Sequence, residues 1–191
     1  MSEASDSTVS PILDALYRGD SDAAERLGSD ASQLDVFEAA ALGRTDRLRD
    51  VLENDPEAVR GWSSDGFMPL HLAAFFGHAD AVALLLDRDA DPGIVSRHQF
   101  VKVTPLHSAV AHEGAADHET ARVLLEHGAP ASARAEQGFT PLHSAAANGD
   151  RPMVELLLEH GADRSARTDD GRTPRALAEE GGYTEVAELL G

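Results

Sequence analysis

The chain of 191 residues contains no cysteine, a single lysine and a single tryptophan, and aromatic residues make up only 5% of it. The absence of cysteine excludes disulfides, cysteine-ligated zinc sites, iron–sulfur clusters and thiol nucleophiles. No stretch approaches the roughly 18 apolar residues that a membrane-spanning helix needs. The acidic opening segment MSEASDSTVS also lacks the basic and apolar regions of a signal peptide. From the sequence we therefore expect a soluble, cytoplasmic protein.

Positive charge is scarce as well. Sixteen Lys and Arg residues stand against 34 Asp and Glu residues, so the formal net charge is −18. Binding to nucleic acid or to an anionic membrane by general electrostatic attraction requires a positive surface, and we expect neither partner. A net charge of this size is typical of a solvated surface. The alternative is an acidic surface that captures a basic partner.

Motifs of common catalytic sites are also missing. The sequence has no glycine-rich phosphate loop and no G-x-S-x-G segment. Ala116 stands where the second histidine of an H-E-x-x-H zinc-protease motif would have to be. We therefore expect no metal site, no cofactor and no enzymatic activity, although five potential metal ligands do gather in one segment: His112, Glu113, Asp117, His118 and Glu119.

What the chain does have is an internal repeat. Six segments align on a recurrent glycine, and the fourth and fifth share the opening T-P-L-H-x-A. They are SPILDALYRGD, LDVFEAAALGR, MPLHLAAFFGH, TPLHSAVAHEG, TPLHSAAANGD and TPRALAEEGGY, which begin at Ser10, Leu34, Met68, Thr104, Thr140 and Thr173.

The fifth segment illustrates how one repeat should fold. Thr140 precedes a proline, which puts a hydroxyl at the N-cap of a helix and a residue without an N–H in its first turn. Small apolar residues at Leu142, Ala145 and Ala146 let a second helix approach closely, and Gly149 ends the first helix. The run from 153 to 158 predicts an apolar return helix. Such a helix pair has more apolar surface than it can cover alone, so the pairs must stack.

The period and the T-P-L-H-x-A opening resemble the ankyrin-repeat family, strongly over residues 34–191 and weakly over 10–33. The resemblance implies an all-α solenoid of stacked helix-turn-helix units with short β-hairpin fingers. We expect residues 1–9 to be a disordered acidic tail. Residues 10–191 should form a single ankyrin-repeat domain with units starting near residues 10, 34, 68, 104, 140 and 173.

The first unit is expected to be a shortened helical cap, with a loose helical tail as the alternative. In the cap, four apolar residues would pack onto the next unit: Ile12, Leu13, Leu16 and Leu27.

His71, His107 and His143 occupy the same position of successive units. The resemblance implies that they are structural, each imidazole bonding to the backbone of the adjoining hairpin. Met68 replaces the threonine that precedes the proline in later units. We expect this change to remove a hydroxyl cap worth about 1 kcal/mol.

The resemblance also implies a function. Ankyrin-repeat proteins dock their partners on a concave surface made of finger tips and first helices, so we expect a non-catalytic protein–protein interaction module. We also expect a monomer that binds an unidentified protein partner. Eleven residues match the partner-binding positions: Phe67, Phe75, Phe76, Gln99, Phe100, Val103, His112, Gln137, Phe139, Asn148 and Arg172.

Several alternatives stay open at this point. The aromatic residues could pack between fingers and helices instead of standing exposed. The longer segments at 94–102 and 111–117 could carry specificity or reflect tolerated drift. The protein could also be an acidic inhibitor that mimics an anionic ligand, or a standalone structural protein. A concave strip free of acids would favour docking, whereas acids crowded onto the fingers would favour mimicry.

Overall fold

In the computed structural model, which describes residues 9–111 and 118–191, twelve short α-helices follow one another in pairs. The first helices of the pairs are α1 (Pro11–Tyr17), α3 (Val36–Ala41), α5 (Pro69–Phe75), α7 (Pro105–Val110), α9 (Pro141–Ala147) and α11 (Pro174–Glu180). The second helices are α2 (Ser21–Leu27), α4 (Thr45–Asn54), α6 (Ala79–Asp87), α8 (His118–Glu126), α10 (Arg151–Glu159) and α12 (Thr184–Leu190). Three 3₁₀ turns are η1 (Ala31–Gln33), η2 (Pro56–Arg60) and η3 (Glu136–Gly138).

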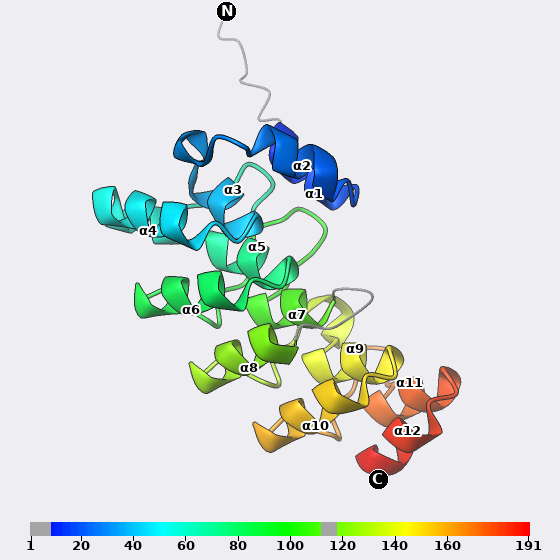
Figure 1. Cartoon of the computed structure of the whole chain (residues 1–191). Helices are drawn as coiled ribbons and strands as arrows, with labels where there is room; N and C mark the ends of the chain where they lie inside the picture. Colours follow the sequence, from blue (N-terminus) through cyan, green and yellow to red (C-terminus); the bar gives the residue numbers. More distant parts are fainter. Residues whose placement is uncertain (1–8, 112–117) are drawn as a thin grey trace, which may run out of the picture.

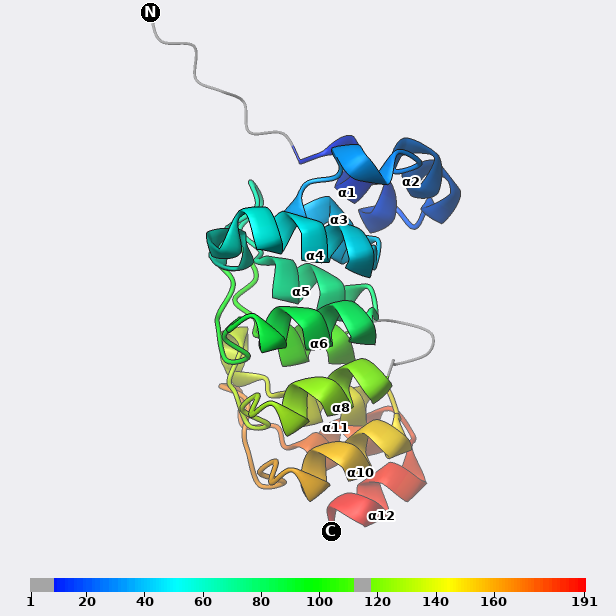
Figure 2. The same ribbon diagram turned by 60° about the vertical axis from the view of Figure 1, so that its left-hand side comes forward.

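The pairs stack in chain order, from α1 and α2 at one end to α11 and α12 at the other (Figure 1). First helices contact first helices of the neighbouring pairs, and second helices contact second helices, so the stack has two layers. Figure 2 shows the layer of second helices from α4 to α12, with the connecting loops gathered along one edge. The predicted all-α solenoid is confirmed.

The core runs through the whole stack as one continuous apolar cluster. Alanines on the first helices, such as Ala73 and Ala145, are completely buried, and this small size lets neighbouring helices approach closely. Leucines such as Leu85 and Leu157 on the second helices are equally buried. Helices of six to ten residues are marginal in isolation, so this packing is what stabilises them.

The fingers between the pairs are tight turns, and the described residues contain no β-strand. Each finger closes by a backbone hydrogen bond, for example from the Ser63 N–H to the Phe67 carbonyl at 2.8 Å. Adjacent fingers are tied together in the same way, because the Arg97 N–H donates to the Gly66 carbonyl at 2.8 Å. The hairpins predicted from the sequence are therefore present as turns, which are too short to form a ladder of paired strands.

The N-terminal helix pair packs on the stack, but only three of its four predicted apolar residues contribute to that packing. Ile12 and Leu13 are buried and Leu16 is partly buried, whereas Leu27 is 55% exposed. The prediction for Leu27 is wrong because Ala24 is the residue of α2 that faces the core. The predicted tail lies outside the described residues except for Val9, which packs against the cluster around Leu13.

The threonines that open the repeats do not all cap their helices. The hydroxyls of Thr104 and Thr140 lie 2.8 and 2.9 Å from Nδ1 of the histidine three residues later, and they cap no backbone N–H. Only Thr173, whose unit lacks this histidine, accepts from a backbone N–H, that of Ala176 at 3.2 Å. What Met68 lacks is therefore a bond to His71, and not the predicted hydroxyl cap.

Candidate functional site

Three buried histidines tie each first helix to the next finger. Their Nε2 atoms lie 3.1 to 3.3 Å from a backbone carbonyl: His71 from Val103, His107 from Phe139 and His143 from Arg172. Nδ1 accepts from the backbone N–H three residues earlier, so the proton sits on Nε2, which donates to the carbonyl. Burial lowers the pKa of His71 and His107 to about 4, and it also lowers the pKa of His143. The structural role of these residues stays a prediction.

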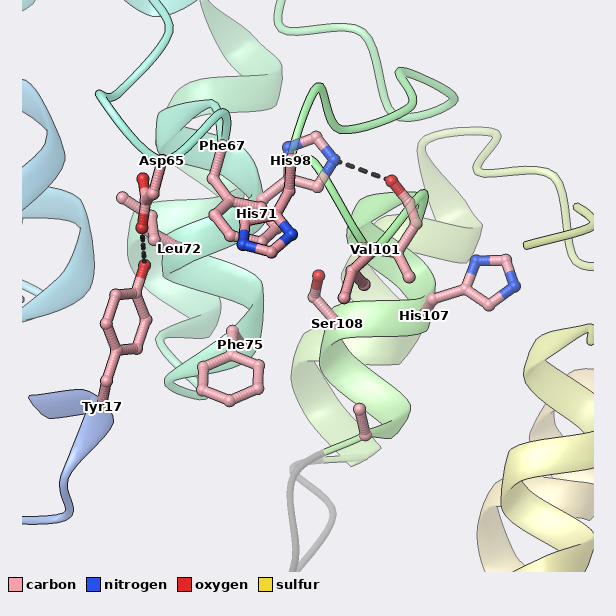
Figure 3. Close-up of a pocket in the computed structure, with 12 residues that line it drawn as sticks. Tyr17, Asp65, Phe67, His71, Leu72, Phe75, His98, Val101, His107 and Ser108 are labelled. Atoms are coloured by element: carbon pink, nitrogen blue, oxygen red, sulfur yellow. Dashed lines mark hydrogen bonds between the residues drawn. The ribbon is translucent and has the colours of Figure 1, made fainter. Parts of the chain in front are cut away.

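A cavity of about 350 Å³ opens on the face formed by the fingers and the first helices, which we call the inner face. Its floor lies between α5, which contributes Leu72 and Phe75, and α7, which contributes Ser108 and is followed by the lining residue Ala111. Figure 3 shows these side chains with the fingers above them. The lining is almost entirely apolar, so the cavity offers a place for an apolar or partly apolar group.

Fingers and the N-terminal helix complete the walls. The finger before α5 contributes Asp65 and Phe67, and the longer finger before α7 contributes His98 and Val101. Tyr17, at the end of α1, closes the side nearest the N-terminal pair. The cavity is therefore assembled from three parts of the stack: the end of α1, α5 with its finger, and α7 with its finger.

The repeat register explains why a cavity forms here. Ser108 in α7 and Ala111 at its C-terminal end occupy the repeat positions that Leu72 and Phe75 occupy in α5. The smaller side chains on α7 leave space that a leucine and a phenylalanine would fill. The pocket exists because two neighbouring repeats differ in side-chain volume at equivalent positions.

Tyr17 occupies the same position in its unit as Phe75, two units later. The unit between them has the buried Ala41 at this position. The centroids of the Tyr17 and Phe75 rings therefore lie 6.5 Å apart, and the rings meet edge to face. Sequence reasoning missed Tyr17 as a site residue. The aligned repeats contained the signal, because Tyr17 is aromatic at the position where Phe75 was singled out.

Asp65 carries the only carboxylate among the described residues that line the cavity. One of its oxygens accepts a hydrogen bond from the Tyr17 hydroxyl at 2.8 Å, and the other accepts from the Ser63 hydroxyl. Burial, and next the hydrogen bond to Asp65, raise the pKa of the Tyr17 phenol above its ordinary value. The phenol therefore stays protonated and donates to the carboxylate.

The predicted aromatic residues divide between the cavity and its surroundings. Phe67 lines the cavity and stacks on His98, with ring centroids 5.2 Å apart and planes 20° apart. Phe76 is not part of the lining; its ring stacks on Tyr17 at 5.9 Å. Phe67, Phe75 and Phe76 are all half-buried, so these three rings are partly packed and none of them stands fully exposed.

Gln99 and Phe100 lie at the tip of the longer finger, outside the lining of the cavity. Phe100 is 70% exposed, the largest exposure of a bulky apolar residue in the described part of the chain. Beside it, the Arg97 guanidinium lies 4.2 Å from the centre of the Trp62 ring. Val103 differs, because it lines the cavity and its carbonyl accepts from His71.

The remaining predicted residues lie further along the stack. Arg172 is 5.8 Å from the centre of the Phe139 ring, and its Nε lies 2.8 Å from an Asp170 oxygen. Gln137 and Asn148 are exposed. The structure does not bring this second group into the cavity. The prediction for His112 and most of the segment 111–117 lies outside the described residues.

Charge is distributed unevenly between the two layers of helices. The three central first helices, α5, α7 and α9, contain no Asp, Glu, Lys or Arg. Every second helix from α4 to α12 carries two or three carboxylates. The inner face therefore has an uncharged strip, whereas the opposite layer carries much of the negative charge.

Within residues 9–111 and 118–191, no helix is long and apolar enough to cross a membrane. The same ranges hold no group of three or more His, Asp or Glu side chains arranged to bind a metal ion. Most of the ligand cluster noted in the sequence falls in the segment outside the described residues.

The comparison with protein families identifies the class. A family model described as "Ankyrin repeats (3 copies)" matches residues 11–135, and one described as "Ankyrin repeats (many copies)" matches residues 124–178. The first match alone covers more than half of the chain. The chain belongs to the ankyrin-repeat family.

Curated relatives contain the same repeats within much longer chains. Ankyrin repeat and SAM domain-containing protein 6 of Mus musculus is 32% identical over 56% of this chain and 11% of its own length. E3 ubiquitin-protein ligase XB3 of Oryza sativa subsp. japonica is 42% identical over 41% of this chain and 17% of its own. Neurogenic locus notch homolog protein 4 of Homo sapiens is 32% identical over 77% of this chain and 6% of its own length. The chain thus spans less than a fifth of each of these relatives.

Family membership establishes a general function. Ankyrin repeats are protein–protein interaction modules, and the family is typically non-catalytic. Some relatives are named as E3 ubiquitin-protein ligases, but the similarity covers only a small part of those proteins.

Proposed function

We propose that this chain binds a protein partner on its inner face, with the cavity between α5 and α7 as the centre of the interface. The observation that carries the proposal is an apolar cavity on a strip of helices without charged residues. Concave apolar sites with a few polar groups are the usual places where ligands bind. An uncharged strip also avoids the cost of removing water from ionised groups when a partner docks.

Phe67 and Phe75 are proposed as the anchors for the partner, together with Tyr17. These aromatic side chains come from three segments and line one cavity, and large aromatic residues dominate the energetics of most interfaces. Phe76 has a different proposed role, since its ring supports Tyr17. Phe100 and Gln99 at the finger tip would form the edge of the same surface. Val103 belongs to the cavity itself, and Phe139, Gln137, Asn148 and Arg172 would extend the surface along the stack.

The alternative, an acidic mimic of an anionic ligand, is less well supported. Mimicry requires free carboxylates on the fingers, but two finger carboxylates are paired with arginines of the same chain. Asp169 lies 3.1 Å from Arg134, and Asp170 lies 2.8 Å from Arg172. The carboxylates of the second helices α4, α6, α8, α10 and α12 belong to the other layer of helices. We further propose that the protein acts as a monomer in the cytoplasm, which light scattering and cell fractionation would test.

The test compares proteins captured from the native cells by the wild type and three variants. Ser108→Leu fills the cavity with the side chain that the preceding repeat has at this position, and Phe75→Ala removes one wall. Leu27→Ser is the matched control, because it changes an apolar residue that is 55% exposed on α2. Quantitative mass spectrometry then measures which proteins each form retains.

We expect the wild type and Leu27→Ser to retain the same proteins, and both cavity variants to lose them by at least tenfold. Circular dichroism must show unchanged helix content in every variant. Retention of the same proteins at the same level by both folded cavity variants would contradict the proposed site.

A further inference from the structure

We infer that the cavity between α5 and α7 receives a cationic side chain whose nitrogen is alkylated, such as a methylated lysine, presented by a basic segment of the partner. This inference rests on the proposed function, since it specifies the chemistry of the group that docks there. It rests on the aromatic walls, on one carboxylate and on the absence of Lys and Arg from the described residues of the lining.

The walls of the cavity include rings from three segments. Tyr17 comes from α1, Phe67 from the finger and Phe75 from α5 (Figure 3). The faces of aromatic rings carry partial negative charge and attract a cation placed over them. Cages built from several such rings are the usual means by which proteins recognise quaternary ammonium groups.

Asp65 adds a full negative charge to these partial charges. The hydrogen bonds that its carboxylate accepts come from the hydroxyls of Tyr17 and Ser63, which are neutral donors. No ion pair of Asp65 occurs within the described residues. Its charge is therefore oriented by two hydroxyls but is not neutralised, and an entering cation would neutralise it.

No permanent cation lines the cavity among the described residues. His71 and His107 belong to the lining, but burial lowers their pKa to about 4, so both are neutral at neutral pH. His98 is the remaining imidazole, and it is stacked on Phe67. The guanidinium of Arg97 lies against Trp62, outside the lining. The net charge of −18 further favours the approach of a basic partner.

The apolar part of the lining selects among cations. Leu72, Val101 and Ala111 offer no acceptors from their side chains, so a bare ammonium would lose its hydration without compensation. Methyl groups on the nitrogen reduce that loss and make van der Waals contacts with the walls. An uncharged aliphatic side chain would fit the same walls, but it would leave the Asp65 carboxylate buried without a counter-charge.

The test uses two small probes that differ in one atom. Nα-acetyl-Nε-trimethyl-lysine amide carries the cation, and its analogue with carbon in place of the quaternary nitrogen is neutral and has the same shape. Binding is followed by NMR titration of the whole chain, wild type and Asp65→Asn. Asparagine keeps an acceptor for the Tyr17 hydroxyl but removes the charge. Asp169→Asn, a finger carboxylate outside the cavity, is the matched control.

We expect the wild type and Asp169→Asn to bind the cationic probe about tenfold more tightly than the neutral one, and Asp65→Asn to lose most of this preference. Shifts should concentrate on residues that line the cavity. Equal binding of the two probes to the wild type, or binding of neither, would overturn the inference. Either result would be compatible with partner capture that depends on the cavity. The proposed function would fail only if the cavity variants captured the same proteins as the wild type.

Discussion

The hydroxyl of Tyr17 donates a hydrogen bond of 2.8 Å to Asp65, 48 residues further along the chain. This bond joins the end of α1 to the finger that precedes α5, and so it crosses the whole second unit. In an ideal solenoid each unit contacts only its neighbours. Here the buried Ala41 is small enough that units one and three make direct contact on the inner face.

Removal of this hydrogen bond should loosen the N-terminal helix pair. Tyr17→Phe keeps the ring against Phe75 and Phe76 but leaves Asp65 without one donor, which should cost about 1 kcal/mol. Hydrogen exchange should become faster in α1 and α2 and should stay unchanged in α9 to α12. Tyr183→Phe is the control, since the Tyr183 hydroxyl has no hydrogen bond among those found in residues 9–111 and 118–191. Equal protection of α1 in the Tyr17→Phe variant and the wild type would show that the bond contributes nothing.

The buried histidines should make stability depend on pH. In the unfolded chain their pKa is 6.5, and in the fold burial lowers it to about 4 for His71 and His107. Between these values the unfolded chain binds more protons, so the free energy of unfolding should fall as the pH falls from 6.5 towards 4. Each histidine adds at most about 1.4 kcal/mol per pH unit.

Urea unfolding between pH 7.5 and 5 measures this slope. Replacement of His107 by glutamine should reduce the slope, because glutamine does not titrate, while His127→Gln at an exposed position should leave it almost unchanged. A wild-type stability that is independent of pH in this window would mean that His71 and His107 titrate alike in both states.

The hydrogen bond between Thr140 and His143 should contribute measurably to the free energy of unfolding. Thr140→Val keeps the shape of the side chain but removes the hydroxyl that lies 2.9 Å from His143 Nδ1. Because this pair is buried, we expect a loss of about 1 to 2 kcal/mol in the free energy of unfolding. Thr45→Val, which removes a longer and less buried hydroxyl contact at 3.3 Å, should cost less. An equal cost for the two changes would argue against a special role for the histidine pairing.

Two glycines with positive φ should respond differently to alanine. Gly149 and Gly161 have φ values of 68° and 81°, so alanine is strained by about 1 to 2 kcal/mol at either position. At Gly149 the new Cβ would also meet the Tyr183 ring, whereas no atom lies near it at Gly161. Gly149→Ala should therefore be the more destabilising change, by roughly another 1 to 3 kcal/mol in chemical unfolding. Equal losses would mean that the Tyr183 ring moves aside without cost.

Much of the fold could be predicted because each repeat contains the local sequence signals that start and end its helices. Proline after the opening threonine, paired alanines and a terminal glycine specify one helix, and the leucine-rich run specifies the next. Errors arose where the partner of a side chain depended on how that side chain is oriented in the fold. Leu27 was placed in the core from its apolar character alone, and the hydroxyls of Thr104 and Thr140 bond to histidine instead of the backbone.

The site was only partly predictable. Phe67, Phe75 and Val103 were singled out from their positions in the repeat and do line one cavity. Phe76 and Phe139 were selected by the same reasoning and lie elsewhere. The side chain at a repeat position can face either the cavity or an adjacent ring, and the volume of residues in the neighbouring units decides which.

The sequence by itself determined the helix pairs, their order and their family, because these follow from local periodicity and from the need of every pair to cover its apolar surface. Only the tertiary structure decided that Tyr17, Asp65 and Phe75 meet around one cavity. That meeting depends on small residues in the units between and beside them, Ala41, Ser108 and Ala111, whose effect appears only when the repeats are stacked.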